Sequence, residues 1–446
     1  MMKKTILATC VILLSPASFA LNLVQAYERA KQSDPNWQAQ VLQYEADQLN
    51  IGLARGNLLP TVTVSGSVNR KNQSLNQSSS GGGLFGGSNL MASTSTTRQI
   101  AVTARQPIFR MDAWQGYKQV KTSVQLSEIT LRLQQQQHML TVAEAYFNVL
   151  RQQALTLTNA QEEKALQQQL QMMTAKLQEG LVAQSDVKEA DAQYQSARAN
   201  RISTGMQLIL AQEQLAQIIG PYKEKLALLS DDFQYQKPVP NLLEEWVNMA
   251  QSKNLEILQA RMQRQYANDA RRVEQAALYP QVEAVATYGY SEQSPTTALS
   301  SDGQFDQIGV EMNWNVYTGG RTTTNIKKAS TNVSKADRQL EAAMRKANTD
   351  VKKSYLQVDM DSSTLQARKA AMQSSELVSK ASRAQYDEGL KTMVDVLLAQ
   401  RNAFATRLDY VNAQYDYVLN MLRLKASVGQ LNEQELSQIN AWLVEK

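Results

Sequence analysis

The stretch Glu388-Gly-Leu-Lys-Thr-Met-Val-Asp-Val-Leu-Leu398 decides how this chain folds. A similar stretch, Glu179-Gly-Leu-Val-Ala-Gln-Ser-Asp-Val-Lys188, lies 209 positions earlier. In each, one glycine interrupts a very long helical pattern, and an aspartate follows in or near the first turn of the next helix, where acidic residues are favoured. We therefore predict that each stretch is the tip of a long helical hairpin.

The helices that lead to these tips are unusually long. Residues 321–388 contain neither glycine nor proline, and their 68 residues would extend for roughly 100 Å as a helix. A helix of this length requires coiled-coil-like packing. Its apolar residues recur at steps of three and four, as in a heptad seam, at Ile326, Ala329, Val333, Ala336, Leu340, Ala343 and Ala347. An ordinary two-helix coiled coil would show the same seam.

The chain repeats itself. Gly180 and Gly389 are 209 positions apart, and so are Tyr146 and Tyr355. Such self-similarity predicts two structural repeats, each ordered helix, strand, strand and long helical hairpin. The predicted segments are 21–228 (hairpin 111–219), a linker at 229–240, 241–431 (hairpin 321–428) and a C-terminal segment at 432–446. The opening helices are expected at about 22–55 and 241–278.

Alternating apolar and polar residues predict strands at about 60–70, 97–109, 280–290 and 307–317. Each has one apolar and one polar face, which suits both an outer-membrane barrel and a soluble antiparallel sheet. The barrel is favoured because no other segment offers a core for such a sheet. Trp314, Tyr317, Tyr288 and Tyr290 are candidates for its aromatic girdle. Four strands cannot close a barrel, and lipid does not tolerate open edges, so two chains would share eight strands or three would share twelve.

Residues 1–20 have the pattern of a secretory signal peptide, with Lys3 and Lys4, an apolar run, and a small-residue site at Ser18-Phe-Ala20. The sole cysteine, Cys10, lies within it. Without these residues the formal charge falls from +5 to +3. The remaining charges are interspersed along helices, which argues against nucleic-acid binding. No later run of apolar residues is long enough for a transmembrane helix.

Several motifs, in order along both repeats, resemble the TolC family of outer-membrane efflux ducts. They are Leu58-Leu-Pro60, Gln106-Pro-Ile-Phe109, Ala145-Tyr-Phe-Asn-Val-Leu150, Gly180-Leu-Val-Ala183 with Asp186-Val187, Val394-Asp-Val-Leu397 and Leu431-Asn-Glu-Gln-Glu-Leu436. The resemblance implies a mixed α and membrane β fold: a homotrimer with a twelve-stranded barrel in outer-membrane lipid, continued by a helical cylinder across the periplasm. It also implies that the tips dock on a periplasmic adaptor (membrane fusion) protein and an inner-membrane pump of the RND, ABC or MFS type.

The resemblance also suggests a gate latch at the tips, made by Asp186 with Tyr386 and Lys391. The family's namesake has an arginine where this chain has Lys391. Lysine keeps the charge but lacks the planar guanidinium fork, so the latch would be weaker. Asp186 is also explained without a latch, as an acid in the first turn of a helix.

At the constriction, Asp395 matches a family aspartate ring, in which facing carboxylates would bind cations and raise one another's pKa. A second family aspartate is replaced by Leu398, which predicts a single acidic ring with a hydrophobic one behind it. The adaptor-facing tips would be the Gly-Leu pairs of the two hairpins, at Gly180, Leu181, Gly389 and Leu390.

Other signals are weaker. The glycines of 81–87 lack the Gly-Lys-Ser/Thr ending of a phosphate loop, and the only histidine, His138, is expected on a helix surface. We therefore predict a passive efflux or type I secretion channel with no cofactor, rather than an enzyme. The alternatives are a periplasmic coiled-coil adaptor without a barrel and a general diffusion porin, which would need more strands per chain. A hydrolase is the least favoured.

Overall fold

A computed structural model describes residues 20–74, 92–230, 235, 237–294 and 302–444. The predicted signal peptide, except Ala20, and the glycine-rich loop at 81–87 lie outside the described residues. The chain divides into two compact units, each made from separate segments. The sheet unit contains 43–129 and 259–342, and the helical unit contains the segments up to 42, 130–258 and 343–446.

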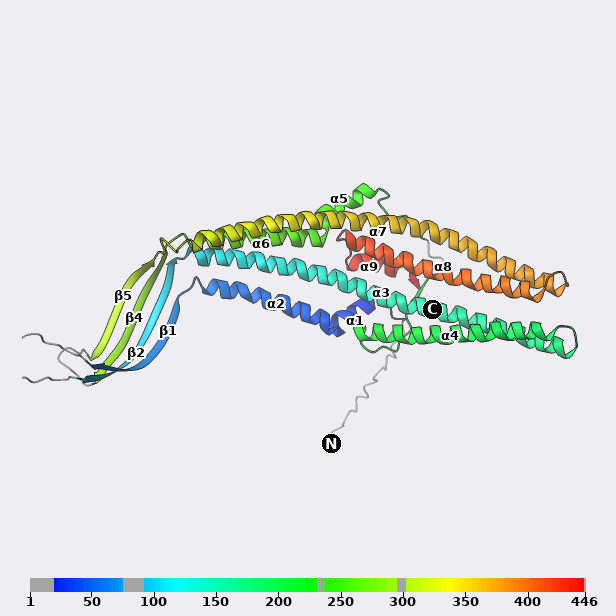
Figure 1. The fold of residues 1–446 in the computed structure, drawn as a ribbon, viewed down its shortest axis with the longest axis horizontal. Coiled ribbons are helices and arrows are strands. Elements are labelled where there is room, and N and C mark those ends of the chain that lie inside the picture. Colours follow the sequence, from blue (N-terminus) through cyan, green and yellow to red (C-terminus); the bar gives the residue numbers. More distant parts are fainter. Residues whose placement is uncertain (1–19, 75–91, 231–234, 236, 295–301, 445–446) are drawn as a thin grey trace, which may run out of the picture. The chain divides into compact units, whose positions relative to one another are not determined.

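The sheet unit holds an antiparallel sheet with the strand order β1-β2-β4-β5 (Figure 1). Its strands are β1 (Thr61–Ser74), β2 (Ala92–Phe109), β4 (Gln281–Ser294) and β5 (Gly303–Asn313). All four extend further toward the loops than the alternation predicted. At its other end β5 stops before Trp314, whose indole Nε1 donates to the carbonyl of Leu278 at 3.1 Å. Trp314 and Tyr317 therefore follow the last strand rather than belonging to it.

The register of the sheet separates an apolar face from a polar face. Val64 pairs with Val102, which pairs with Tyr288, and these side chains are exposed, as is Ile308 on β5 at 86%. On the other face the hydroxyls of Thr103 and Thr287 lie 3.3 Å apart. Within the described residues, the outer edges of β1 and β5 pair with no strand. The unit thus has an uncovered apolar face and two free edges.

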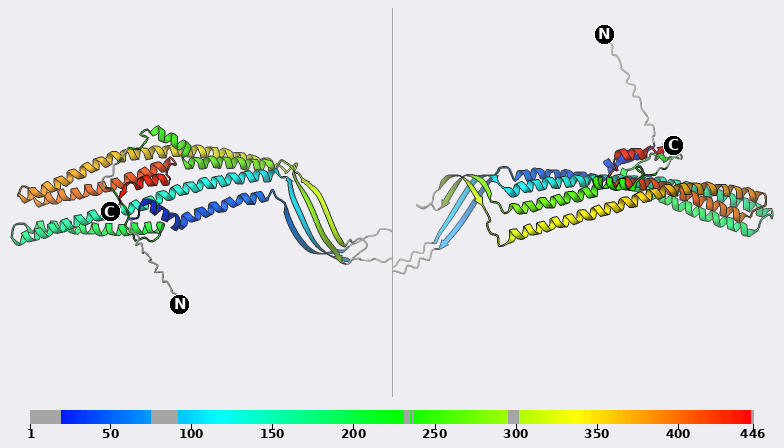
Figure 2. Two further views of the ribbon diagram at one scale, coloured as in Figure 1. Left: turned by 180° about the vertical axis from the view of Figure 1, so that it is seen from behind. Right: turned by 90° about the horizontal axis from the view of Figure 1, so that it is seen from above.

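Most of the chain is helical. The helices are α1 (Leu23–Ser33), α2 (Pro35–Gly56), α3 (Met111–Gln178), α4 (Gln184–Ile219), α5 (Leu243–Lys253), α6 (Leu255–Ala276), α7 (Arg321–Asp387), α8 (Met393–Ser427) and α9 (Glu433–Asn440). A small sheet pairs β3 (Leu228–Leu229) with β6 (Leu443–Val444). In the helical unit, α4 lies beside the C-terminal part of α3, and α8 lies beside that of α7 (Figures 1 and 2).

The two opening helices are each broken, which corrects the prediction of continuous helices at 22–55 and 241–278. Asp34 is extended (ψ 110°) because a residue before proline is disfavoured in the helical region. Asn254 is extended too (ψ 125°), although no proline follows. Its side chain accepts from the Ile257 amide at 3.0 Å and donates to the Ser427 carbonyl at 2.6 Å, which fixes the break.

The seam predicted along α7 faces inward. None of its residues is exposed, and the seam continues into the fully buried Val351. The main core of the helical unit surrounds Tyr146, whose hydroxyl lies 3.0 Å from the carbonyls of both Leu21 and Ala227. In the described part of the chain, no helix combines the length and apolar character needed to cross a membrane.

Candidate functional site

The first tip is a glycine-terminated helix end. The amide of Gly180 donates to the backbone carbonyl of Leu177 at 3.0 Å, and the amide of Leu181 donates to the backbone carbonyl of Lys176 at 2.9 Å. This pair of bonds is the Schellman motif, which requires a left-handed residue at the glycine position. Gly180 has φ +73°, a conformation that glycine adopts without a steric penalty. The Gly-Leu pair therefore makes the turn.

The second tip repeats this geometry at the end of α7. Gly389 has φ +79°. Its amide donates to the backbone carbonyl of Tyr386 at 2.9 Å, and the amide of Leu390 donates to the backbone carbonyl of Gln385 at 2.8 Å. In a Schellman motif the residue after the glycine commonly packs back on its own helix. Here Leu181 is 67% exposed and Leu390 is 72% exposed. Both tips therefore present an uncovered leucine.

The two aspartates lie in the first turns of the return helices. At α8, the carboxylate of Asp395 accepts from the backbone and hydroxyl of Thr392 at 3.0 and 2.6 Å, and the Asp395 amide donates back to that hydroxyl at 3.3 Å. These bonds form a capping box. They lower the pKa of Asp395, with a smaller contribution from Lys391. At α4, the Asp186 carboxylate accepts from the Ala183 amide at 3.4 Å, so Asp186 lies in the first turn, as the simpler interpretation expected.

Behind the tips lies a small apolar core shared by α3, α4 and α8. It is centred on Met173, Ala190 and Val396, with Tyr386 packed at its margin. Leu398 lies outside this core and is 58% exposed. Because Asp395 and Leu398 are three positions apart on one helix, they project from the same side.

Among the described residues of this single chain, no hydrogen bond joins the three predicted latch residues to one another. Tyr386 contacts Lys176 of α3, whose Nζ lies 3.3 Å from the Tyr386 hydroxyl and 4.6 Å from the ring centroid. Lys391 donates from Nζ to the hydroxyl of Ser382 at 2.9 Å. Neither is among the hydrogen-bond partners of Asp186 in the described part of the chain. Sequence reasoning missed Lys176, which lies 210 positions from Tyr386, and Ser382, which lies nine positions from Lys391 across the turn, because no local pattern marks either contact.

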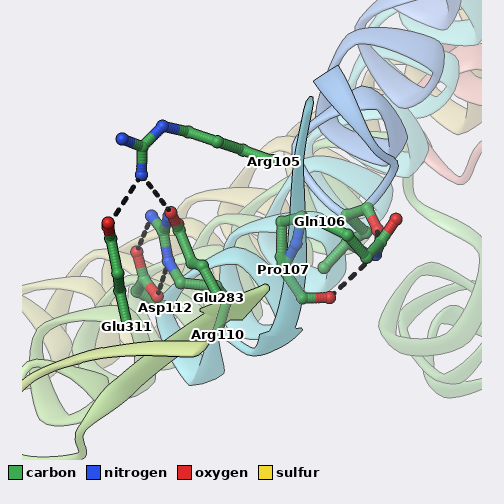
Figure 3. Close-up of polar contacts among 8 residues, drawn as sticks. Arg105, Gln106, Pro107, Arg110, Asp112, Glu283 and Glu311 are labelled. Atoms are coloured by element: carbon green, nitrogen blue, oxygen red, sulfur yellow. Dashed lines mark hydrogen bonds and ion pairs between the residues drawn. The ribbon is translucent and has the colours of Figure 1, made fainter. Parts of the chain in front are cut away.

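A charged network in the sheet unit was also missed (Figure 3). Arg105 lies 2.9 Å from Glu311 and 3.8 Å from Glu283, while Arg110 bonds Glu283 at 2.7 Å and Asp112 at 2.7 and 3.0 Å. Glu283 and Glu311 are direct partners across β4 and β5, a like-charge arrangement that is unfavourable alone. Arg105 bridges them. Arg110 lowers the pKa of Asp112.

The prediction that His138 lies on a helix surface is wrong, because the residue is buried, with 8% of its surface exposed. Its Nε2 lies 3.1 Å from Asp34 Oδ2, and its ring stacks on Trp37 with centroids 5.3 Å apart. Burial lowers the pKa of His138, and Asp34 opposes this shift. The break between α1 and α2 brings Asp34 and Trp37 to this face of α3. A single histidine in a helical sequence pattern does not indicate that residues from another helix will bury it.

Comparisons with known proteins cover almost the entire chain. The outer membrane efflux protein family matches residues 26–221 and 246–430. The outer membrane protein TolC of Escherichia coli is 32% identical over 440 residues, covering 96% of this chain and 86% of TolC. The alkaline protease secretion protein AprF of Pseudomonas aeruginosa is 24% identical over 438 residues, covering 97% of this chain and 89% of AprF.

The fold has the same relatives. The crystal structure of the CmeC outer membrane channel of Campylobacter jejuni superposes with a TM-score of 0.79 at 15% identity, covering 95% of this chain and 90% of CmeC. At this identity the likeness concerns the fold alone. The matches therefore extend over sheet-forming and helical segments alike.

Proposed function

Because this chain belongs to the outer membrane efflux protein family and is an outer-membrane channel for efflux or secretion, we propose that three copies of it form one passive exit duct. The free edges and uncovered apolar face of the sheet carry this proposal. In lipid, every backbone polar group must be paired within the protein, so β5 of one copy would pair with β1 of the next. Three copies, the number that the family resemblance favours, would close twelve strands.

The helices offer further surfaces for neighbouring copies. α4 exposes a helical stripe of large apolar residues, and α7 exposes another pair spaced by four. They are Ile202, Met206, Ile209 and Leu210 on α4, and Leu356 and Met360 on α7. Such stripes at helical spacing suit packing against another helix. In the proposed duct they would be covered by adjacent copies, and the helical cylinder would cross the periplasm.

The tips would be the gate and the docking site for partners. The exposed Leu181 and Leu390 support docking of a periplasmic adaptor protein, with an inner-membrane pump supplying the energy. The duct itself would be neither an enzyme nor dependent on a cofactor. Opening would be an untwisting of the 321–428 hairpin after the contacts of Asp186 with Tyr386 and Lys391 break. Substrates would leave by efflux, by secretion, or by both. Secretion is supported by the similarity to AprF, which is an alkaline protease secretion protein.

Single-channel conductance in planar bilayers tests the latch. Asp186→Ala and Lys391→Ala should each raise conductance, because each removes one partner of the contact that holds the tip shut. Asp191→Ala is the matched control, since its carboxylate lies one turn further along α4 and bonds Gln195 at 3.2 Å. Unchanged conductance in both latch variants would contradict the latch. Recovery of the protein from the soluble periplasmic fraction would instead favour the adaptor alternative.

A further inference from the structure

We infer that the sheet carries a binding site for an anionic, phosphate-bearing lipid, formed by Arg70 and Arg98 where the apolar face ends. The site rests on the proposed function, because that function places the apolar face in the outer membrane. Both arginines belong to one copy of the chain, so the site does not depend on how neighbouring copies pair. The strand register, the charges at one end of the sheet and a hollow in its surface support it.

The height of the apolar face places the two arginines at the edge of the membrane. Along β4 this face runs from Val282 to Tyr290, roughly 27 Å at about 3.4 Å per residue. A barrel strand is tilted by about 40°, so this length covers roughly 21 Å across a membrane. The next residue on the same face, Glu292, pairs with Arg98 and lies at roughly 26 Å, where an apolar band about 25 Å tall ends. The Arg98 row therefore meets the lipid headgroups.

The arginines lie at the end of the sheet that points away from the helices. Within the sheet unit, the strands join helical segments at the opposite end, where β2 leads into α3 and β5 leads toward α7 (Figure 1). In the proposed duct the helices cross the periplasm. Arg70 and Arg98 would then lie among the headgroups of the outer leaflet, and the occupant of the site is a lipid of that leaflet.

The two guanidinium groups have donors available for a phosphate. Arg98 pairs with Val68, and Arg70 follows Val68 on the same face of β1, so the arginines are diagonal neighbours about 7–8 Å apart, within reach of each other's long side chains. Within the described residues, Arg70 is exposed and forms no hydrogen bond or ion pair. Arg98 is 62% exposed and lies 3.9 Å from Glu292, too far for a hydrogen bond. Paired N–H donors of this kind are suited to phosphate oxygens.

The charges on the apolar face are separated by sign. Within the four strands, its basic residues are Arg70 on β1 and Arg98 on β2, and its acidic residues are Glu292 on β4 and Asp306 on β5. The positive end of the row is thus confined to the first two strands, where it attracts an anionic headgroup. The competing partner for Arg70 would be Asp306 of a neighbouring copy, because β5 and β1 would lie side by side in the proposed barrel.

A hollow in the apolar face lies next to the arginines on the membrane side. Gly66 pairs with Ile100, which pairs with Tyr290, and the missing side chain of Gly66 leaves the surface low at this row. An added Cβ at Gly66 would meet only the carbonyl oxygen of Gln99, at 3.9 Å. The hollow is a cavity of about 270 Å³, lined by Gly66, Ser67, Val68, Arg98, Gln99, Ile100, Tyr290 and Glu292. An acyl chain can lie there while its phosphate contacts the arginines.

Native mass spectrometry of the intact complex in mild detergent tests the site. Added phosphatidylglycerol, which is anionic, should bind more tightly than phosphatidylcholine with the same acyl chains. Arg70→Gln and Arg98→Gln should each weaken phosphatidylglycerol binding about fivefold. Lys71→Gln is the matched control, because it removes the same charge from the adjacent position on the opposite face of β1, where Lys71 pairs with Ser95. Inorganic phosphate at the same concentration should not displace the lipid.

The hollow has its own pair of variants. Gly66→Val should weaken phosphatidylglycerol binding by filling the cavity. Gly309→Val should not, because Gly309 lies on the other face of β5, opposite Val285. Neither glycine has a positive φ, so valine strains neither backbone.

Three results would overturn the inference. They are equal lipid binding in Arg70→Gln and Lys71→Gln, equal binding of the two lipids by the parent, and displacement of the lipid by inorganic phosphate, which would show a site for free phosphate only. Dissociation of the complex in Arg70→Gln with unchanged lipid binding would assign Arg70 to a neighbouring copy and would overturn it too. The same spectra count the chains: a complex of another size would contradict the duct, whereas lipid binding that is lost with Arg70 and Arg98 would still uphold the site.

Discussion

Gly180→Ala isolates the backbone contribution to the tip. A Cβ built on Gly180 would meet nothing within 4 Å, so the substitution creates no clash with another residue. The whole effect comes from φ +73°, where an L-residue costs about 1–2 kcal/mol. This cost falls on the Schellman turn, whose bonds include the amide of Leu181.

The assay is hydrogen exchange at that amide. A loss of about 1–2 kcal/mol corresponds to a change of roughly 5-fold to 30-fold in the equilibrium for local opening. The Leu181 amide, which donates to Lys176 at 2.9 Å, should therefore exchange faster by that factor in Gly180→Ala. In Gly180→Asn, the exchange rate of the Leu181 amide should lie between the rates of the parent and of Gly180→Ala, because asparagine is the next most tolerated residue at this position.

Gly205→Ala is the matched control. Gly205 lies inside α4, has no positive φ and also has nothing within 4 Å of an added Cβ. Alanine should stabilise this helix by about 0.5–1 kcal/mol and slow local exchange. The same chemical change is thus expected to have opposite signs at two glycines. Unchanged exchange at Leu181 in Gly180→Ala, together with slowing around residue 205, would refute the assignment of the turn to its left-handed glycine.

Three further predictions concern charged groups. Asp395→Asn should weaken block of the channel by divalent or trivalent cations, measured in bilayers, because the amide keeps a capping oxygen but loses the charge. Arg105→Gln should destabilise the protein by about 0.5–1 kcal/mol, because Glu283 and Glu311 are left facing each other. The melting temperature of the variant should fall further below that of the parent at low salt than at high salt, where the repulsion between the two carboxylates is screened. His138→Phe should flatten the loss of thermal stability between pH 7.5 and pH 5.

The sign of the histidine prediction follows from proton linkage. The folded chain holds His138 at a lowered pKa, so the unfolded chain binds the proton first as pH falls, and stability is lost below the ordinary pKa. Parallel pH profiles for the parent and His138→Phe would contradict this. Unaltered cation block in Asp395→Asn would exclude Asp395 as the cation site. For Arg105, adding Glu311→Gln should recover the lost stability; no recovery would mean that Arg105 acts through other contacts.

Local chemistry explains which parts of the fold could be predicted. The tip turns depend on single residues, Gly180 and Gly389, and the faces of the sheet follow from alternation, so both were accessible from the sequence. The break at Asp34 carries a signal in the following proline, although the helical periodicity across it concealed the break. The break at Asn254 has no such signal, because it depends on a bond to Ser427.

The candidate site was predictable only in part. The resemblance suggested Tyr386, Lys391 and Asp395 as site residues, a prediction that stays open, but it gave no sign of the contacts that Tyr386 and Lys391 make with Lys176 and Ser382. The contact of Tyr386 with Lys176 joins residues 210 positions apart, and the charged network around Arg105 joins β2, β4 and β5. Such contacts depend on how hairpins and strands from the two halves of the chain are placed side by side, and neither spacing nor composition encodes that placement.

The most direct test of the account is the mass of the intact complex extracted from the outer membrane in mild detergent. Because the free edges of β1 and β5 would have to pair with further copies in lipid, we predict a complex of three chains. A complex of two chains, or a monomer that is stable in the outer membrane, would contradict the shared twelve-stranded barrel on which the proposed duct depends.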